Sequence, residues 1–137
     1  MPLRSAAVSI AVTSALALAA CGGADGDGGE AAEQRATPAQ ARAEIGQVRK
    51  GLAAAVASLR EGDAKAADDA VAEAYVEHFE KVEGPLEKVD GDLKERLEDG
   101  IREDLRDKIK AGASVAEISG MVQTIEVDLA TAERKLR

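Results

Sequence analysis

Apolar residues recur at steps of three and four along most of this chain, and that spacing restricts the possible fold more than any other feature. In an α-helix such steps place side chains on one face. The first series contains Ile45, Val48, Leu52, Val56 and Leu59. The last and most regular series contains Ile118, Val122, Ile125, Leu129, Ala132 and Leu136. No segment after Cys21 has the alternating, β-branched pattern of a strand, so the sequence predicts an all-α fold.

Capping and turn residues divide this apolar pattern into four helices. Thr37 and Gln40 form a capping box, with Pro38 at the first helical position. Gly62 and Gly112 are natural helix stops. Further caps are expected at Asp63 and in a second capping box, Ser114-Val115-Ala116-Glu117. We therefore expect residues 37–137 to form an antiparallel four-helix bundle, with helices near 38–61, 64–83, 92–111 and 115–136. Ala-rich stretches in the first two helices allow their backbones to approach closely.

The second helix has an apolar side and an acidic side. At about 100° per residue, the apolar side carries Val71, Tyr75, His78 and Val82, with Phe79 and Leu86 at its edge. The opposite side carries Glu73, Glu77 and Glu80, while Glu83 lies at the boundary beside Phe79. Gly84-Pro85 is expected to weaken or kink the helix.

The third helix carries an apolar residue at every fourth position, in the series Leu93, Leu97, Ile101, Leu105 and Ile109. In an α-helix such a strip drifts by about 40° per step. We therefore expect this helix to cross its neighbours at an angle or to bend near Gly100. From the four patterns together, we expect buried side chains at Leu52, Tyr75, Val82, Leu97, Ile125 and Leu129.

The first 20 residues have the pattern of a secretory signal peptide. Arg4 precedes an apolar run, Ala6 to Leu18, that is too short to span a bilayer comfortably. The sequence Leu18-Ala19-Ala20-Cys21 then resembles a bacterial lipobox. The resemblance implies that Cys21, the only cysteine, receives a diacylglycerol, becomes the mature N-terminus and is acylated again. The alternative is an ordinary signal peptide cleaved after Ala20, which would leave a free thiol in an oxidising compartment.

The lipobox predicts an extracytoplasmic protein that its lipid anchors to the cell membrane. Residues 21–36 are rich in Gly, Asp, Ala and Glu without an apolar period, so we expect a flexible acidic tether. The chain has a net charge of −8, with 26 Asp and Glu against 18 Lys and Arg. Nucleic-acid binding is not expected, because neutralising phosphates requires clustered cations. An acidic surface also has no attraction to anionic lipid, so membrane contact should come from the lipid on Cys21.

The rare side chains of the sequence gather in one stretch. Tyr75 and Phe79 are its only aromatic residues and His78 is its only histidine. Among them, Glu77, Glu80 and Glu83 are spaced three apart, which makes them neighbours on a helix. Such carboxylates can hold a hard cation weakly, in exchange with water. The alternative is a solvated helix face without a metal.

The same stretch does not predict catalysis. There is no Glu-x-x-His pair of the kind that di-iron bundles use, so a closed catalytic metal site is not expected. Tyr75 and His78 fit a core pair whose polar tips bond to a carboxylate or backbone group, or else a ligand or proton-transfer site. With one histidine, one cysteine and no phosphate-binding loop, we expect no enzymatic activity.

The order of these motifs resembles a known family. It runs Gly62-Asp63, Ala74-Tyr75, Phe79-Glu80, Val82-Glu83 and Leu86, followed by Asp90, Leu93, Leu97, Glu98 and Ala111-Gly112. This order is similar to the extracytoplasmic helical domain attached to some bacterial high-affinity iron permeases, over roughly residues 45 to 135. The resemblance implies that Tyr75, Glu80 and Glu83 are candidates for iron contact. The permease's membrane helices, which carry its iron-translocating glutamates, do not occur in this sequence, so we do not expect the chain to transport iron itself.

Two functions remain open from the sequence. The first is an accessory iron-binding module associated with iron uptake, with an iron permease or another uptake component as partner. Its candidate metal residues are Glu80, Glu83, Glu77 and Tyr75, and iron is the one candidate metal. The second is a structural or interaction lipoprotein, without a metal, that docks on another envelope protein.

The anchoring hypothesis leads to a direct prediction. Cys21→Ser removes the thiol that accepts the lipid, so the variant should move from the membrane fraction to the soluble fraction. Cell fractionation followed by salt and carbonate washes measures this. A variant that stays with the membrane through both washes would show that Cys21 is not the anchor.

Overall fold

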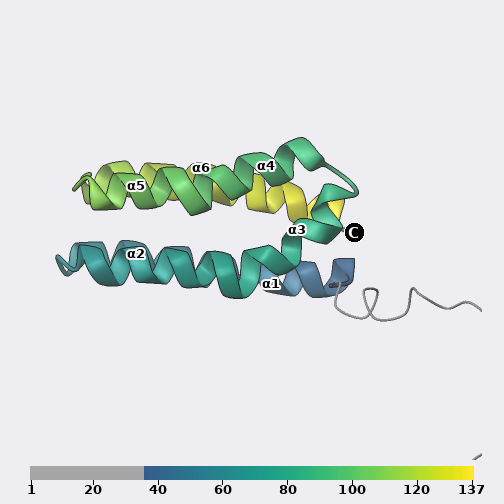
Figure 1. The fold of residues 1–137 in the computed structure, drawn as a ribbon, viewed down its shortest axis with the longest axis horizontal. Coiled ribbons are helices and arrows are strands. Elements are labelled where there is room, and N and C mark those ends of the chain that lie inside the picture. Colours follow the sequence, from purple (N-terminus) through teal and green to yellow (C-terminus); the bar gives the residue numbers. More distant parts are fainter. Residues whose placement is uncertain (1–35) are drawn as a thin grey trace, which may run out of the picture.

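The computed structural model describes residues 36–137, and this part of the chain is all-helical. It contains four helical rods (Figure 1). The first rod is α1 (Pro38–Arg60) and the fourth is α6 (Val115–Lys135). The second rod runs through α2 (Ala64–Glu73), the π-helical segment η1 (Ala74–Phe79) and α3 (Glu80–Glu87). The third runs through α4 (Gly91–Asp99), the π-helical segment η2 (Gly100–Asp104) and α5 (Leu105–Lys110).

Residues 1–35 lie outside this description, and with them the signal peptide, Cys21 and nearly all of the tether. Among residues 36–137, no helix has both the length and the apolar character that a membrane crossing requires.

The capping residues lie where the sequence predicts them. The Thr37 hydroxyl accepts from the Gln40 amide at 3.2 Å, and the Gln40 side chain accepts from the Thr37 amide at 2.8 Å, which completes the capping box. Gly62 and Gly112 end their helices with φ of 83° and 78°, a conformation that glycine adopts without steric cost. Ser114 caps α6, but Glu117 does not return the second bond of a box. It pairs with Lys108 at 3.0 Å instead.

The second rod extends further than predicted, because it continues through Gly84-Pro85 to Glu87. Pro85 is buried inside α3, and because it has no amide donor, the i→i−4 bond to the carbonyl of Lys81 is missing there. In Figure 1, α3 leaves the line of α2 and reaches towards the rod that contains α4.

The core is built from the predicted apolar strips. All six residues expected to be buried, from Leu52 to Leu129, are buried. His78 is the exception to the predicted register, because its side chain remains 30% exposed while Phe79 is fully buried. The π-helical segment explains this difference. Its i→i+5 bonds place more residues in each turn, so the step of four from Val71 to Tyr75 to Phe79 stays in line with the core and His78 moves to the rim.

A second π-helical segment keeps the third rod in register. All five residues of its four-step series, Leu93 to Ile109, are buried. In an uninterrupted α-helix the last of them would have drifted by about 160° from the first. The wider turns of η2, which begins at Gly100, absorb part of that drift.

The first and second rods approach most closely at Gly51. A Cβ atom added there would lie 2.5 Å from the Cβ of Ala74 and 3.4 Å from the carbonyl oxygen of Ala70. This contact agrees with the close approach expected from the Ala-rich stretches. It also holds the start of η1 against α1.

This contact predicts opposite effects for two glycine substitutions in α1. Gly51→Ala should lower the free energy of unfolding by about 1–3 kcal/mol, because the new methyl group overpacks the crossing. Gly46→Ala, with nothing within 4 Å of its added Cβ, should raise it by about 0.5–1 kcal/mol. Denaturant unfolding of both variants measures the difference. Equal stability of the two variants would show that the rods separate at Gly51 without cost.

Candidate functional site

The two π-helical segments meet at one place in the fold. Tyr75 belongs to η1 and Arg102 to η2, and the guanidinium carbon of Arg102 lies 5.9 Å from the centre of the Tyr75 ring. That distance is within the range of a cation–π contact. We call the group formed by Tyr75, Glu83, Lys94, Glu98 and Arg102 the π seam. Because π-helical turns are frequent at functional sites, the π seam is the first candidate site.

Tyr75 and Glu83 form a bonded pair within the π seam. The Tyr75 hydroxyl donates to Glu83 Oε1 at 2.7 Å. Burial raises the pKa of the Glu83 carboxyl, and the charges of Glu98 and Glu80 raise it further, while the bond from Tyr75 partly offsets the shift. Burial also raises the pKa of the Tyr75 hydroxyl above its usual value, and the charge of Glu83 adds to this effect. The pair therefore consists of a neutral phenol and a carboxylate that is partly shielded from water.

Two cations from the third rod neutralise Glu98. Arg102 Nη1 lies 2.9 Å from one carboxylate oxygen and Lys94 Nζ lies 3.1 Å from the other. Arg102 Nη2 also bonds Glu103 at 2.7 Å, which is the main cause of the raised pKa of Arg102. Lys94 also reaches Glu87, on α3, at 3.4 Å. Lys94 is therefore shared by a carboxylate of the second rod and one of the third, while both ion pairs of Arg102 lie within the third rod.

The fold brings together two of the four predicted metal residues. Tyr75 and Glu83 are in contact, and Glu80 is exposed but near enough for its charge to raise the pKa of Glu83. Glu77 is exposed on the outer side of η1. Sequence reasoning did not assign Glu98, Lys94 or Arg102 to the site. No local spacing could have found them, because they approach Tyr75 only when the third rod packs against the second.

The donor set of the π seam consists of oxygen atoms. Within residues 36–137 no group of three or more His, Cys, Asp and Glu side chains is arranged to hold a metal ion. The π seam instead offers two carboxylates, Glu83 and Glu98, and the phenol of Tyr75. These are hard donors of the kind that hard cations prefer. The chemistry of the donors fits a hard cation such as iron. Lys94 and Arg102, however, already neutralise the charge of Glu98.

His78 pairs with the first rod, outside the π seam. Its Nδ1 atom lies 2.7 Å from Glu44 Oε2, and Lys81 lies 3.7 Å from the other oxygen of Glu44. The polar tips of His78 and Tyr75 therefore both bond to carboxylates, as expected, but His78 lies at the rim and the two residues do not form a core pair.

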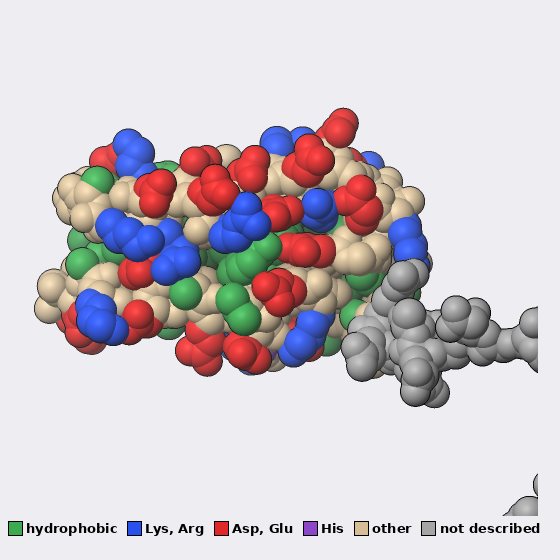
Figure 2. Space-filling view, in the orientation of Figure 1, with side chains coloured by type: hydrophobic (Ala, Val, Ile, Leu, Met, Phe, Trp, Pro, Cys, Tyr) green, Lys and Arg blue, Asp and Glu red, His purple; other side chains and the backbone are tan. Residues whose placement is uncertain are grey.

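The surface around the π seam carries both signs of charge. Figure 2 shows Lys and Arg side chains along the line between the second and third rods, with Asp and Glu on both sides. One of these contacts is bidentate, because Arg106 of α5 bonds the two oxygens of Asp68 of α2 at 2.7 and 3.0 Å. This bond lowers the pKa of Asp68. The cations along this line thus tie the third rod to the second.

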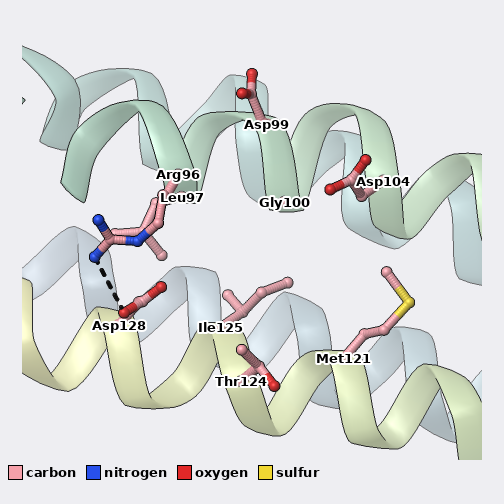
Figure 3. Close-up of a pocket in the computed structure, with 9 residues that line it drawn as sticks. All are labelled: Arg96, Leu97, Asp99, Gly100, Asp104, Met121, Thr124, Ile125 and Asp128. Carbon is pink, nitrogen blue, oxygen red and sulfur yellow. Dashed lines mark ion pairs between the residues drawn. The ribbon is translucent and has the colours of Figure 1, made fainter. Parts of the chain in front are cut away.

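A groove of about 400 Å³ lies elsewhere, between the third rod and α6 (Figure 3). Arg96 reaches across one end of it to Asp128, at 3.5 Å, while Ile125 and Met121 point from α6 towards the opposite helix. Asp99 and Asp104 add carboxylates from the third rod. None of the predicted metal residues lines this groove.

Comparisons with protein-family models, with curated proteins and with solved structures each return no match. The resemblance to the iron permease domain therefore stays an expectation from the sequence.

The shifted pKa of Glu83 predicts a pH-dependent stability. A raised carboxyl pKa means that the folded chain holds this proton more tightly than the unfolded chain does. The folded state therefore loses stability as the pH rises from the ordinary value of 4.5 through the raised pKa of Glu83. Glu83→Gln still accepts the Tyr75 hydroxyl but does not ionise. The free energy of unfolding of the variant, relative to wild type, should thus be higher at about pH 7 than at about pH 3.

Denaturant unfolding across this pH range measures the effect. Glu77→Gln, on the exposed side of the same rod, shows how much of the change comes from removing one negative charge from an acidic chain. If the difference in free energy of unfolding between Glu83→Gln and wild type does not vary with pH, Glu83 has the same pKa in the folded and unfolded chains.

Proposed function

We propose that this chain is an extracytoplasmic lipoprotein, anchored to the cell membrane through Cys21, that binds iron reversibly as an accessory module of iron uptake. In this proposal the four rods form an antiparallel bundle that presents the π seam on its side. The observation that supports it is the partly buried Tyr75–Glu83 pair beside Glu98, in which three oxygen donors from two rods lie together.

Partial burial favours cation binding at this place. The raised pKa of Glu83 reflects both lost hydration and repulsion from Glu98 and Glu80, and a bound cation relieves that repulsion. Attraction between opposite charges is also stronger where water is partly excluded. With few protein donors, water completes the coordination shell, so binding is weak and exchangeable, as a capture site requires.

The candidate residues have different roles in this proposal. Glu83 and Glu80 supply charge, and Glu77, on the outer side of η1, contributes least. Tyr75 binds as a ligand only after its hydroxyl loses the proton that it donates to Glu83, so the affinity for iron rises with pH. The lipid on Cys21 holds the module at the membrane, where an iron permease or another uptake component is the proposed partner.

The groove between the third rod and α6 favours a second candidate function. Its floor is apolar, at Leu97, Ile125 and Met121, and Asp104 lies at its rim, while the Asp99 carboxylate points away from α6 (Figure 3). Such a surface suits a cationic side chain of another envelope protein. This observation supports the alternative of a metal-free interaction lipoprotein.

Iron titration separates the two functions. The double variant Glu80→Gln/Glu83→Gln removes the charge of the proposed site, so its affinity for iron should fall by about tenfold or more, equivalent to about 1.4 kcal/mol. Glu73→Gln/Glu95→Gln is the matched control, because it removes two exposed glutamates that make no ion pair within residues 36–137. Its affinity should stay close to that of wild type.

Circular dichroism establishes that each variant keeps its helical content. Equal iron binding by wild type and the Glu80→Gln/Glu83→Gln variant, or no binding by either, would remove the metal site. The interaction lipoprotein would then be the remaining function.

A further inference from the structure

We propose that the groove between the third rod and α6 is a docking site for a cationic peptide segment of a partner protein, about five residues long. In this complex the stem of an Arg or Lys lies on the apolar floor, and its charge pairs with Asp104. The inference rests on the interaction role proposed above for the groove, and it does not require the chain to bind iron.

Two ion pairs between the third rod and α6 mark the ends of this site. Arg96 reaches Asp128 at 3.5 Å, and Lys108 reaches Glu117 at 3.0 Å. Between them, within the part of the chain that the structure describes, no ion pair connects the two helices. At 1.5 Å per residue, positions 96 and 108 lie about 18 Å apart along their rod. That length accommodates about five residues of an extended peptide.

The stretch between the two ion pairs is hollow, and its floor is apolar. The groove and a second hollow next to it are both lined by Asp104 and Met121, so the two adjoin. Leu97 and Ile125 lie buried at the bottom, while Met121 is only partly buried (Figure 3). A flexible thioether side chain adapts to partners of different shape. The floor can therefore receive the aliphatic stem of an Arg or Lys, whose charged end stays at the rim.

The rim of the groove carries an anion without a counterpart. Asp104 is exposed and makes no ion pair within residues 36–137. Arg96 shows the same mode of contact inside the chain, because its side chain crosses one end of the groove to reach Asp128 (Figure 3). A cationic side chain of a partner thus makes at Asp104 the contact that Arg96 makes at Asp128.

The charge of the chain distinguishes a basic partner from two other occupants. The net charge is −8, so a second copy of the chain and an anionic membrane surface are both repelled from a groove with an acidic rim. A basic segment of a different protein is attracted to the same rim. We therefore assign the groove to a basic peptide.

The test uses a synthetic probe with this chemistry. The probe is a five-residue peptide in which leucine and arginine alternate, and the control peptide has glutamate in place of arginine. NMR spectra of the ¹⁵N-labelled full chain show where each peptide binds and how tightly. The amide signals of Gly100, Asp104 and Met121 should shift with the arginine peptide and not with the glutamate peptide.

Three variants test the contacts one by one. Asp104→Asn removes the charge at the rim, so the affinity for the arginine peptide should fall by about two- to fivefold, as expected for an exposed ion pair. Asp99→Asn is the matched control, because Asp99 is exposed on the same rod but its carboxylate points away from α6 (Figure 3). Its affinity should stay close to that of wild type. Gly100→Leu should abolish binding by filling the groove, since a Cβ atom added at Gly100 would lie 3.6 Å from the Ile125 side chain.

A larger loss in Asp104→Asn than in Asp99→Asn, with shifts confined to the groove, supports the proposal. Equal losses would overturn it, because the effect would then be one of net charge. Unchanged binding by Gly100→Leu, with its helical content kept in circular dichroism, would also overturn it. Shifts at Gly100 that depend on protein concentration without peptide would assign the groove to a second copy.

The remaining outcomes separate this inference from the proposed functions. If the arginine peptide binds elsewhere on the chain, the groove is not the docking site, but an interaction role stands. If the peptide does not bind, the interaction role of the groove fails as well. The iron titration of Glu80→Gln/Glu83→Gln decides the iron-binding function independently of both results.

Discussion

The packing of this domain depends on two π-helical turns. Without η1, the step of four from Tyr75 to Phe79 would carry Phe79 towards the edge of the apolar strip and leave a histidine facing the core. Without η2, the apolar strip of the third rod would rotate away from its neighbours before reaching Ile109. A wider turn in each rod keeps the large apolar side chains in the core. In return, the backbone hydrogen bonds of that turn have poorer geometry than those of an α-helix.

The same two turns bring the polar chemistry together. Each wider turn lies where its rod changes register, and the two turns face each other through the Tyr75–Arg102 contact. Around them, the polar groups are mutually satisfied. Within residues 36–137 no buried side-chain nitrogen or oxygen lacks a hydrogen-bond partner. Ion pairs also link neighbouring rods, as Arg49 does by reaching both Glu126 and Glu133 on α6. The domain therefore combines an apolar core with a rim in which most charges have opposite neighbours.

This mutual satisfaction bears on the proposed function. A cation site that is fully formed before binding would need several carboxylates held close together, and their repulsion would lower the stability of the fold. The π seam avoids that cost, because Tyr75 donates to Glu83 and two cations neutralise Glu98. In the proposed function, a bound cation has to reorganise these contacts. The proposal therefore implies weak affinity and easy release.

The sequence by itself determined the helical fold class, the helix ends and most of the core. These properties are local, because capping and the three- and four-residue spacing depend on residues within one or two turns. Thr37, Gly62, Asp63 and Gly112 end or begin helices where predicted, and Leu52, Leu97 and Leu129 are buried as expected. The family resemblance grouped Tyr75 with Glu83, whereas the helical pattern alone placed Glu83 beside Phe79.

Only the tertiary structure decided the register changes and the other half of the π seam. A π-helical turn is stable when packing against neighbouring rods compensates for its poorer hydrogen bonds, so its position cannot be derived from the propensities of one helix. His78 illustrates this, because one wider turn moves it from the predicted apolar side to a pairing with Glu44 on α1. Arg102 reaches Tyr75 from a different rod and brings its partner Glu98 with it, and that approach depends on how the second and third rods pack. Spacing along the chain carries no information about it.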